Sequence, residues 1–207
     1  MAKNICIIDY GIGNILSVIR SVKTAGFNVV VTREEKEILK SDKVILPGVG
    51  AFKNGMDLLE KFNLVRAIHR FVESKKPILG ICLGMQLFFD ESSEFGYTEG
   101  LKLIKGKIKK LPEDKKKILK IPNIGWNDLI IKKKDMLFSN LNEKNSTYFV
   151  HSYMAVPEDN SVVTSVYRFG NHEVVASVNF NNIFGCQFHP EKSGKIGLSI
   201  LKNFVSN

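Results

Sequence analysis

The feature that most constrains the fold is a regular alternation of short apolar runs with helical patterns before Gly100. We predict strands over Asn4–Asp9, Phe27–Thr32, Val44–Leu46 and Pro77–Ile81, and helices over Ile15–Ala25, Glu34–Lys40, Met56–Ser74 and Met85–Glu91. Strands that are separated by helices lie parallel, because a helical crossover returns the chain to the same end of the sheet. The alternation therefore predicts an α/β fold, with a mostly parallel central sheet flanked by helices.

The pattern changes after Gly100, where short strands follow one another between Pro, Gly and Asn turns. We expect strands over Ile118–Ile121, Leu129–Ile131, Thr147–Val150, Val162–Tyr167, Val174–Val178 and Ile183–Gln187, and a final helix over Ile196–Val205. Neighbouring strands joined by short turns pair antiparallel. Without a Gly/Ser linker or an internal repeat, the sequence favours a single domain over residues 1–207, with an antiparallel extension in its C-terminal half.

The cysteines and the hydropathy pattern indicate the compartment. Cys6, Cys82 and Cys186 are odd in number and far apart, which argues against a disulfide scaffold and fits a reducing compartment. No apolar stretch approaches the ~20 residues of a membrane span, and the first residues lack the pattern of a signal peptide. We expect a cytoplasmic protein that does not contact a membrane.

Basic side chains outnumber acidic ones by 30 to 21, and lysines gather between Lys102 and Lys134. A nucleic-acid site would need arginines or aromatic stacking platforms among these lysines, and both are sparse. Lysines alternate with apolar residues, as in Lys107-Ile108-Lys109, which is typical of a strand with one solvated face. We favour the solvated face and expect no nucleic-acid partner; steering of anionic phosphate substrates or of an acidic partner is the third interpretation.

The segment Gly80-Ile81-Cys82-Leu83-Gly84 joins the most apolar predicted strand to a helix. It has the form Gly-x-nucleophile-x-Gly, in which small residues permit a sharp bend that exposes the nucleophile. The N-terminus of the following helix favours a thiolate. The alternative is a buried structural cysteine, because free cysteines are among the most buried residues.

A second chemical signal lies in Gln187-Phe188-His189-Pro190-Glu191. On a strand, residues two apart project to the same face, so His189 and Glu191 are expected side by side. A histidine oriented by a carboxylate is the base that a thiol nucleophile needs. The alternative is a surface pair beside a turn; together with the cysteine bend, the catalytic interpretation is favoured.

A third signal is Pro47-Gly48-Val49-Gly50, which follows a predicted strand. The backbone amide of Val49 or Gly50, with that of Leu83, can form an oxyanion hole, although a simple turn explains this segment equally well. The Gly11-Ile12-Gly13 segment has Leu16 where a dinucleotide fingerprint needs its third glycine. The histidines show no metal-ligand spacing with the cysteines, so we expect neither cofactor nor metal.

These segments together resemble the class I (triad-type) glutamine amidotransferases, and within them the glutaminase subunits of imidazole glycerol phosphate synthases. The resemblance spans nearly the whole chain. It is carried by the three segments above and by Asp9–Asn14, Ala51-Phe52, Met85–Leu87, Ile124–Asn127, Tyr148–Tyr153 and Lys192-Ser193. The elbow and the His-Pro-Glu segment are common to the class, whereas Gly125-Trp126-Asn127 is more specific to these subunits.

The resemblance implies a chemistry and a partner. Cys82 would attack the amide of glutamine with help from His189 and Glu191, giving a thioester that water hydrolyses to glutamate. Ammonia would pass to a (β/α)8-barrel synthase subunit that makes imidazole glycerol phosphate in histidine biosynthesis. By the family pattern Gln86, Glu94, Ser152 and Tyr153 hold glutamine, Val49 and Gly50 lie at the oxyanion, and Trp126, Asn127, Tyr148 and Lys192 face the partner. In such enzymes the glutaminase is nearly silent alone.

Two departures from the family pattern leave alternatives open. Asn123 replaces the usual histidine, and the Lys109–Lys117 segment is rich in lysine. Both permit a paralogue that feeds ammonia to another acceptor, for instance in a sugar-modifying amidotransferase. A free-standing peptidase or γ-glutamyl hydrolase of the same fold is a further alternative, which high activity without a partner would favour.

Overall fold

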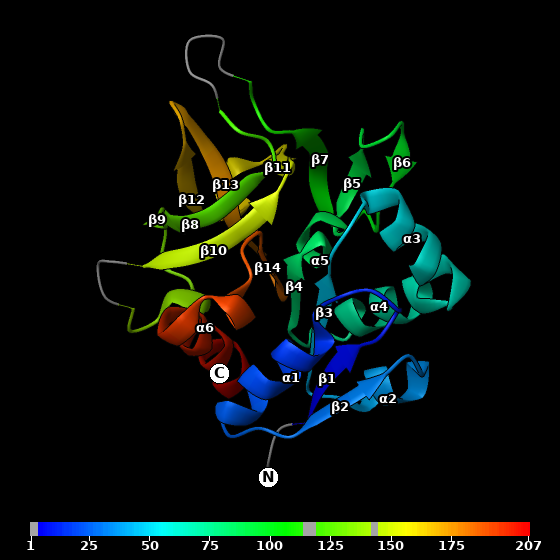
Figure 1. Ribbon diagram of the computed structural model, residues 1–207. Coiled ribbons are helices and arrows are strands. Elements are labelled where there is room, and N and C mark those ends of the chain that lie inside the picture. The colour runs from blue at the N-terminus through cyan, green and yellow to red at the C-terminus, as the bar shows by residue number, and fades with distance from the viewer. Residues whose placement is uncertain (1–3, 114–118, 142–144) are drawn as a thin grey trace.

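An eight-stranded sheet forms the centre of the fold (Figure 1). The computed structural model describes residues 4–113, 119–141 and 145–207. In spatial order the strands are β2 (Val29–Thr32), β1 (Ile5–Ile8), β3 (Lys43–Gly48), β4 (Ile78–Cys82), β14 (Ile183–Cys186), β13 (His172–Phe180), β12 (Val163–Phe169) and β9 (Ile130–Ile131). Pairing is parallel from β2 to β14 and antiparallel from β14 to β9, which confirms the predicted fold class.

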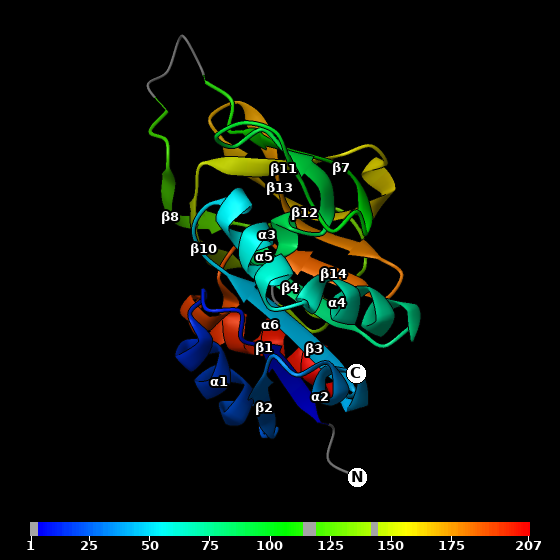
Figure 2. The ribbon, with the colours of Figure 1, turned by 90° about the vertical axis from the view of Figure 1, so that its right-hand side faces the viewer.

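Helices cover both faces of the parallel part (Figure 2). They are α1 (Ile15–Thr24), α2 (Glu35–Lys40), α3 (Phe52–Lys61), α4 (Leu64–Glu73), α5 (Leu83–Gln86) and α6 (Gly194–Ser206). The buried side chains of α2, α3 and α4 join one hydrophobic cluster, and those of α1 and α6 join a second cluster on the other face. Strands β1, β3 and β4 contribute to both clusters, which explains their nearly continuous apolar sequences.

Strand β14 brings the C-terminal part of the chain into the parallel half. Although β14 follows the antiparallel strands in sequence, it pairs parallel with β4, and Cys186 lies in register with Ile81. The residues that follow β14 therefore begin beside the end of β4. This topology places the Gln187–Glu191 segment next to Cys82.

Two smaller sheets complete the fold. One contains β5 (Phe89–Ser92), β6 (Thr98–Glu99), β7 (Ile104–Lys110) and β11 (Tyr153–Pro157); the other pairs β8 (Asn123–Asp128) with β10 (Ser146–His151). In β7, Ile104 and Ile108 are buried while Lys105, Lys107 and Lys109 are exposed, as the predicted solvated face requires. Several of the clustered lysines also pair with acidic residues, namely Lys102 with Glu99, Lys105 with Asp90, Lys107 with Glu91 and Lys132 with Glu173.

Two predicted helices are wrong in extent. The single helix over Met56–Ser74 is two helices, α3 and α4, because Asn63 adopts a left-handed backbone with φ 56°. The helix over Met85–Glu91 ends already at Gln86 in α5, and the chain continues into β5. Amphipathic spacing does not show the local break, because the buried side chains of both helices join the same cluster.

The strand over Ile118–Ile121 is also wrong in its described part, since residues 119–121 form no strand. Ile118 and residues 114–117 of the lysine-rich segment lie outside the described residues. In the part of the chain that the structure describes, no helix is long and apolar enough to cross a membrane.

Candidate active site

Cys82 lies at a sharp bend between β4 and α5. Its backbone has φ 55° and ψ −110°, a conformation that is strained for any residue other than glycine and costs about 1–3 kcal/mol. Only 6% of Cys82 is exposed. The following helix has just four residues, so the helix N-terminus that the sequence predicted supplies few aligned peptide dipoles.

Gly80 and Gly84, on either side of Cys82, are required because backbone atoms approach them too closely for a side chain. A Cβ at Gly84 would lie 1.9 Å from the backbone oxygen of Leu46, and a Cβ at Gly80 would lie 2.6 Å from the backbone nitrogen of Met85. Both contacts are with backbone and cannot be relieved by a rotamer change. Gly84 thus lets the bend pack against β3, and Gly80 lets α5 pack against the end of β4.

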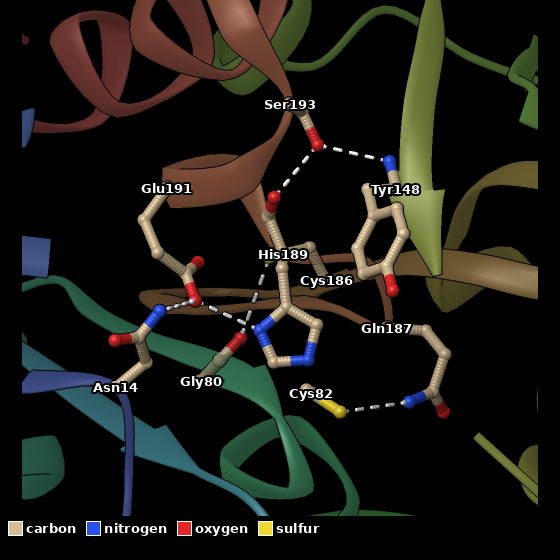
Figure 3. Close-up of polar contacts among 9 residues, drawn as sticks. All are labelled: Asn14, Gly80, Cys82, Tyr148, Cys186, Gln187, His189, Glu191 and Ser193. Atoms are coloured by element: carbon tan, nitrogen blue, oxygen red, sulfur yellow. Dashed lines mark hydrogen bonds and ion pairs between the residues drawn. The ribbon is translucent and has the colours of Figure 1, made fainter. Parts of the chain in front are cut away.

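His189 and Glu191 form a buried pair beside the cysteine (Figure 3). His189 Nδ1 lies 2.8 Å from Glu191 Oε1, and their side chains are 2% and 1% exposed. The imidazole lies between the Glu191 carboxylate and the Cys82 sulfur, and its Nε2 has no partner among the described residues. A carboxylate accepts the Nδ1–H, so Nε2 is the nitrogen that faces the sulfur.

The pairing arises differently from the prediction. Strand β14 ends at Cys186, and Glu191 lies in a 3-10 turn over Pro190–Lys192, so the two side chains meet across a turn and not along a strand. Ser193 fixes this turn, because its hydroxyl donates to the His189 carbonyl at 2.6 Å and accepts from the Tyr148 amide at 3.0 Å.

The surroundings of His189 favour its protonated form. Burial alone lowers the pKa of His189, but the nearby Cys82 sulfur and the hydrogen-bonded Glu191 carboxylate outweigh burial and raise this pKa to about 10. His189 therefore holds a proton at neutral pH, in a position to give it to a group bound at the sulfur.

The Pro47–Gly50 turn borders the same site. Gly48 lies in register with Cys82 across β3 and β4, and Gly50 adopts φ 94°. A cavity of about 260 Å³ opens here. It is lined by Val49, Gly50, Cys82, Leu83, Gln86, Glu94, Pro122, Val150, His151, Ser152, Tyr153 and His189.

The cavity contains all of the residues that the resemblance assigned to glutamine and the oxyanion. Glu94 also accepts a hydrogen bond from the Phe52 amide at 2.7 Å, which ties it to the start of α3. Among the described residues, no group of three or more His, Cys, Asp or Glu side chains could hold a metal ion.

The residues expected to face a partner divide into two groups. Trp126 and Tyr148 lie opposite each other on β8 and β10, with ring centroids 6.1 Å apart, and Lys192 Nζ lies 5.8 Å from the Tyr148 ring. Trp126 is 57% exposed. Asn127 follows Trp126 on β8 and is only partly exposed, so it lies on the opposite face of the strand.

Comparison with known proteins agrees with this geometry. Residues 6–207 match the family model described as glutamine amidotransferase class-I. The chain belongs to this family. Among solved structures, a glutamine amidotransferase superposes with a TM-score of 0.75 at 15% identity, covering 98% of this chain and 99% of that one. The structure of PurLQS from Thermotoga maritima superposes with a TM-score of 0.72 at 21% identity, covering 100% and 99%.

Relatives of this amidotransferase include proteins described as imidazole glycerol phosphate synthase subunit HisH. The one from Syntrophotalea carbinolica is 46% identical over 203 residues, covering 97% of this chain and 98% of the relative. The one from Bacillus cereus is 48% identical over 200 residues, covering 97% and 93%.

The amidotransferase site includes residues to which the sequence analysis gave no role. Gln187 contacts the Cys82 sulfur, and Asn14 Nδ2 lies 3.5 Å from Glu191 Oε1. His151 lines the cavity beside Ser152. No sequence signal pointed to Gln187, because β14 ends at Cys186 and Gln187 lies outside the strand.

Asn123, which departs from the family pattern, lies behind the cavity. Its side-chain amide donates to the Tyr167 hydroxyl at 3.1 Å, and this hydroxyl contacts His151 Nε2 at 2.9 Å. Asn123 therefore supplies a hydrogen-bond donor to a buried polar chain and does not contact Cys82, His189 or Glu191.

Proposed function

We propose that this chain is the glutaminase subunit of an imidazole glycerol phosphate synthase, hydrolysing glutamine and passing the ammonia to a synthase subunit in histidine biosynthesis. The observation that carries the proposal is the buried Glu191–His189 pair facing a strained Cys82 at a cavity. The full-length relatives support this acceptor over a sugar-modifying pathway.

The first half of the reaction forms a thioester. The Cys82 sulfur, as a thiolate, attacks the side-chain carbonyl carbon of glutamine. The oxygen that becomes negative is held by backbone N–H groups of Leu83 and of Val49 or Gly50, which border the cavity. His189 gives its proton to the amide nitrogen, the C–N bond breaks, and ammonia leaves.

The second half releases glutamate. His189, now neutral, takes a proton from water as the water oxygen attacks the thioester carbon. The C–S bond breaks and returns the thiolate, while His189 is again protonated. Glu191 accepts the Nδ1–H throughout and keeps the imidazole in the tautomer and orientation that both steps need.

Gln86, Glu94, Ser152 and Tyr153 would hold the glutamine. Glu94 offers a carboxylate for the α-ammonium group, and the backbone and hydroxyl groups of the 152–153 segment offer hydrogen bonds. The cavity is small, at about 260 Å³, and several polar groups line it, as expected for an amino-acid substrate.

The partner would be a (β/α)8-barrel subunit, giving a heterodimer in which ammonia is channelled. The exposed Trp126 and Ile124, with the Tyr148–Lys192 contact, form an aromatic and basic surface next to the cavity. Lyase chemistry would belong to that partner and hydrolysis to this chain. The free thiols of Cys6, Cys82 and Cys186 fit the cytoplasm, and a sheet that uses both ends of the chain supports one domain over residues 1–207.

The test is glutamate release in the presence of the purified barrel subunit and its nucleotide substrate. We expect activity that depends on the partner and is abolished in Cys82→Ala, with the variant still binding the partner. Full activity in Cys82→Ala would overturn the assignment of Cys82 as the nucleophile. High turnover by the isolated chain would favour the free-standing hydrolase instead.

A further inference from the structure

Gln187 is a buried amide that contacts the reactive sulfur. It is 0% exposed, and its Nε2 lies 3.6 Å from Cys82 Sγ, within the range of a hydrogen bond to sulfur (Figure 3). Its backbone is held independently, because its N–H donates to the Ala176 carbonyl at 2.8 Å. Gln187 thus belongs to the fixed frame around the nucleophile.

A chain of hydrogen bonds decides which end of the amide faces the sulfur. The Tyr153 carbonyl can only accept, and it receives a hydrogen bond from Gln86 Nε2 at 3.0 Å. The same nitrogen lies 2.9 Å from Gln187 Oε1 and needs an acceptor there. Gln187 must therefore present its oxygen to Gln86 and its NH₂ group to Cys82.

We propose that Gln187 is a further catalytic residue, whose side-chain N–H donates to the Cys82 sulfur and stabilises it as a thiolate. The inference rests on the proposed function, since it concerns the nucleophile of that reaction. A thiolate accepts hydrogen bonds more strongly than a thioester sulfur. The contact therefore acts when the resting thiolate forms and again when the sulfur leaves during thioester hydrolysis.

A second buried cysteine of the same chain lies beside an acceptor instead of a donor. Cys186 is also buried, but its sulfur lies 3.8 Å from the Gly80 carbonyl, which can only accept. Burial raises the pKa of Cys186 well above its ordinary value. The Cys186 sulfur therefore lies against an acceptor, whereas the next residue, Gln187, supplies a donor to the Cys82 sulfur.

The test measures the reactivity of Cys82 towards iodoacetamide across pH, followed by mass spectrometry of the Cys82 peptide. In Gln187→Met we expect the pH of half-maximal reactivity to rise by roughly one unit, because the thiolate loses a donor. In Gln187→Glu we expect at least as large a rise, because a carboxylate adds a like charge.

Turnover with the barrel subunit separates this role from substrate binding. Gln187→Glu keeps an acceptor for Gln86, so we expect kcat to fall roughly tenfold with little change in KM. Gln187→Met should also raise KM, because Gln86 loses its partner. The matched control is Ser177→Ala, which removes a buried hydroxyl that bonds Thr164 and Ser165 and does not contact the sulfur. Its reactivity profile should equal that of the unmodified chain.

An unchanged reactivity midpoint in both Gln187 variants would overturn the inference and leave the proposed function intact. Loss of the proposed function would show separately, as activity retained in Cys82→Ala. If the variants do not fold, NMR of the unmodified chain decides. The side-chain amide protons of Gln187 should shift when Cys82 is alkylated, and a shift absent there would overturn the contact.

Discussion

Two buried histidines border the same cavity and differ in charge. His189 contacts Glu191 and faces Cys82, and its pKa is raised to about 10. His151 is 7% exposed, its Nδ1 lies 2.8 Å from the Tyr153 carbonyl and its Nε2 lies 2.9 Å from the Tyr167 hydroxyl. Burial lowers the pKa of His151, whereas the hydrogen bond with the Tyr153 carbonyl raises it. The effect of burial is larger, and the pKa is about 4.

The difference shows that charged partners can outweigh burial in deciding the protonation state. Burial disfavours the charged form of both rings. His189 has a carboxylate and a sulfur that compensate for burial, whereas His151 has only neutral partners. Because the Tyr153 carbonyl can only accept, His151 carries its hydrogen on Nδ1 and accepts from Tyr167 at Nε2. His189 is therefore placed to transfer a proton, whereas His151 stays neutral.

The largest expected effect is on turnover after removal of either imidazole. His189→Gln should lower kcat for glutamate release by at least roughly a thousandfold, because the leaving amine loses its proton donor. His151→Gln should lower it by at most roughly tenfold. Steady-state glutamate release with the barrel subunit measures both, and similar losses in the two variants would remove the distinction between the rings.

The next effect sharpens the role of the carboxylate. Glu191→Gln replaces the negative charge by an amide, which can present its NH₂ to the imidazole and disfavour the required tautomer. We expect kcat to fall roughly a hundredfold to ten-thousandfold, with KM nearly unchanged. A variant with normal kcat would mean that Glu191 only supports the turn.

The third effect is on stability at acidic pH. The pKa of His151 lies below its ordinary value of 6.5, so between pH 6.5 and 4 the unfolded chain binds a proton that the folded chain does not. Neutral His151 therefore makes its full contribution to stability above pH 6.5. As the pH falls from 6.5 to about 4, the free energy of unfolding decreases by roughly 3 kcal/mol in total.

Urea unfolding at a series of pH values measures this loss. The difference in free energy of unfolding between the unmodified chain and His151→Gln should shrink over this range and stay constant above it. His189→Gln is the control and should keep the acid-dependent loss. A difference that does not vary with pH would contradict the prediction, because it would show that His151 has the same pKa in the folded and unfolded chains.

The smallest effect concerns the hydroxyl behind His151. Tyr167→Phe removes the donor to Nε2, and the free energy of unfolding at pH 7 should fall by about 1 kcal/mol. Glutamate release should stay close to that of the unmodified chain, because Tyr167 contacts neither the sulfur nor Glu191. A thousandfold loss of activity would instead place Tyr167 in the proton path.

The sequence predicted the strands of the parallel half more reliably than its helices. Apolar runs such as Ile78–Cys82 are buried on both faces, so burial alone makes them recognisable. The break at Asn63 and the early end of α5 were missed, because helical periodicity continues across both. Gln187 and His151 could not be assigned a role from their sequence positions. A buried amide or imidazole resembles any core polar residue until its partners are known.

By itself the sequence determined the chemical types at the site: a cysteine between two glycines, and a histidine with a carboxylate two residues later. Local steric effects act over a few residues, so such short patterns can be recognised in the sequence alone. Only the tertiary structure decided that β14 inserts beside β4, that a turn brings Glu191 to His189, and that Gln187 contacts the sulfur. These outcomes depend on which distant strands pair and on which groups then meet in a water-poor interior, and no local pattern encodes that.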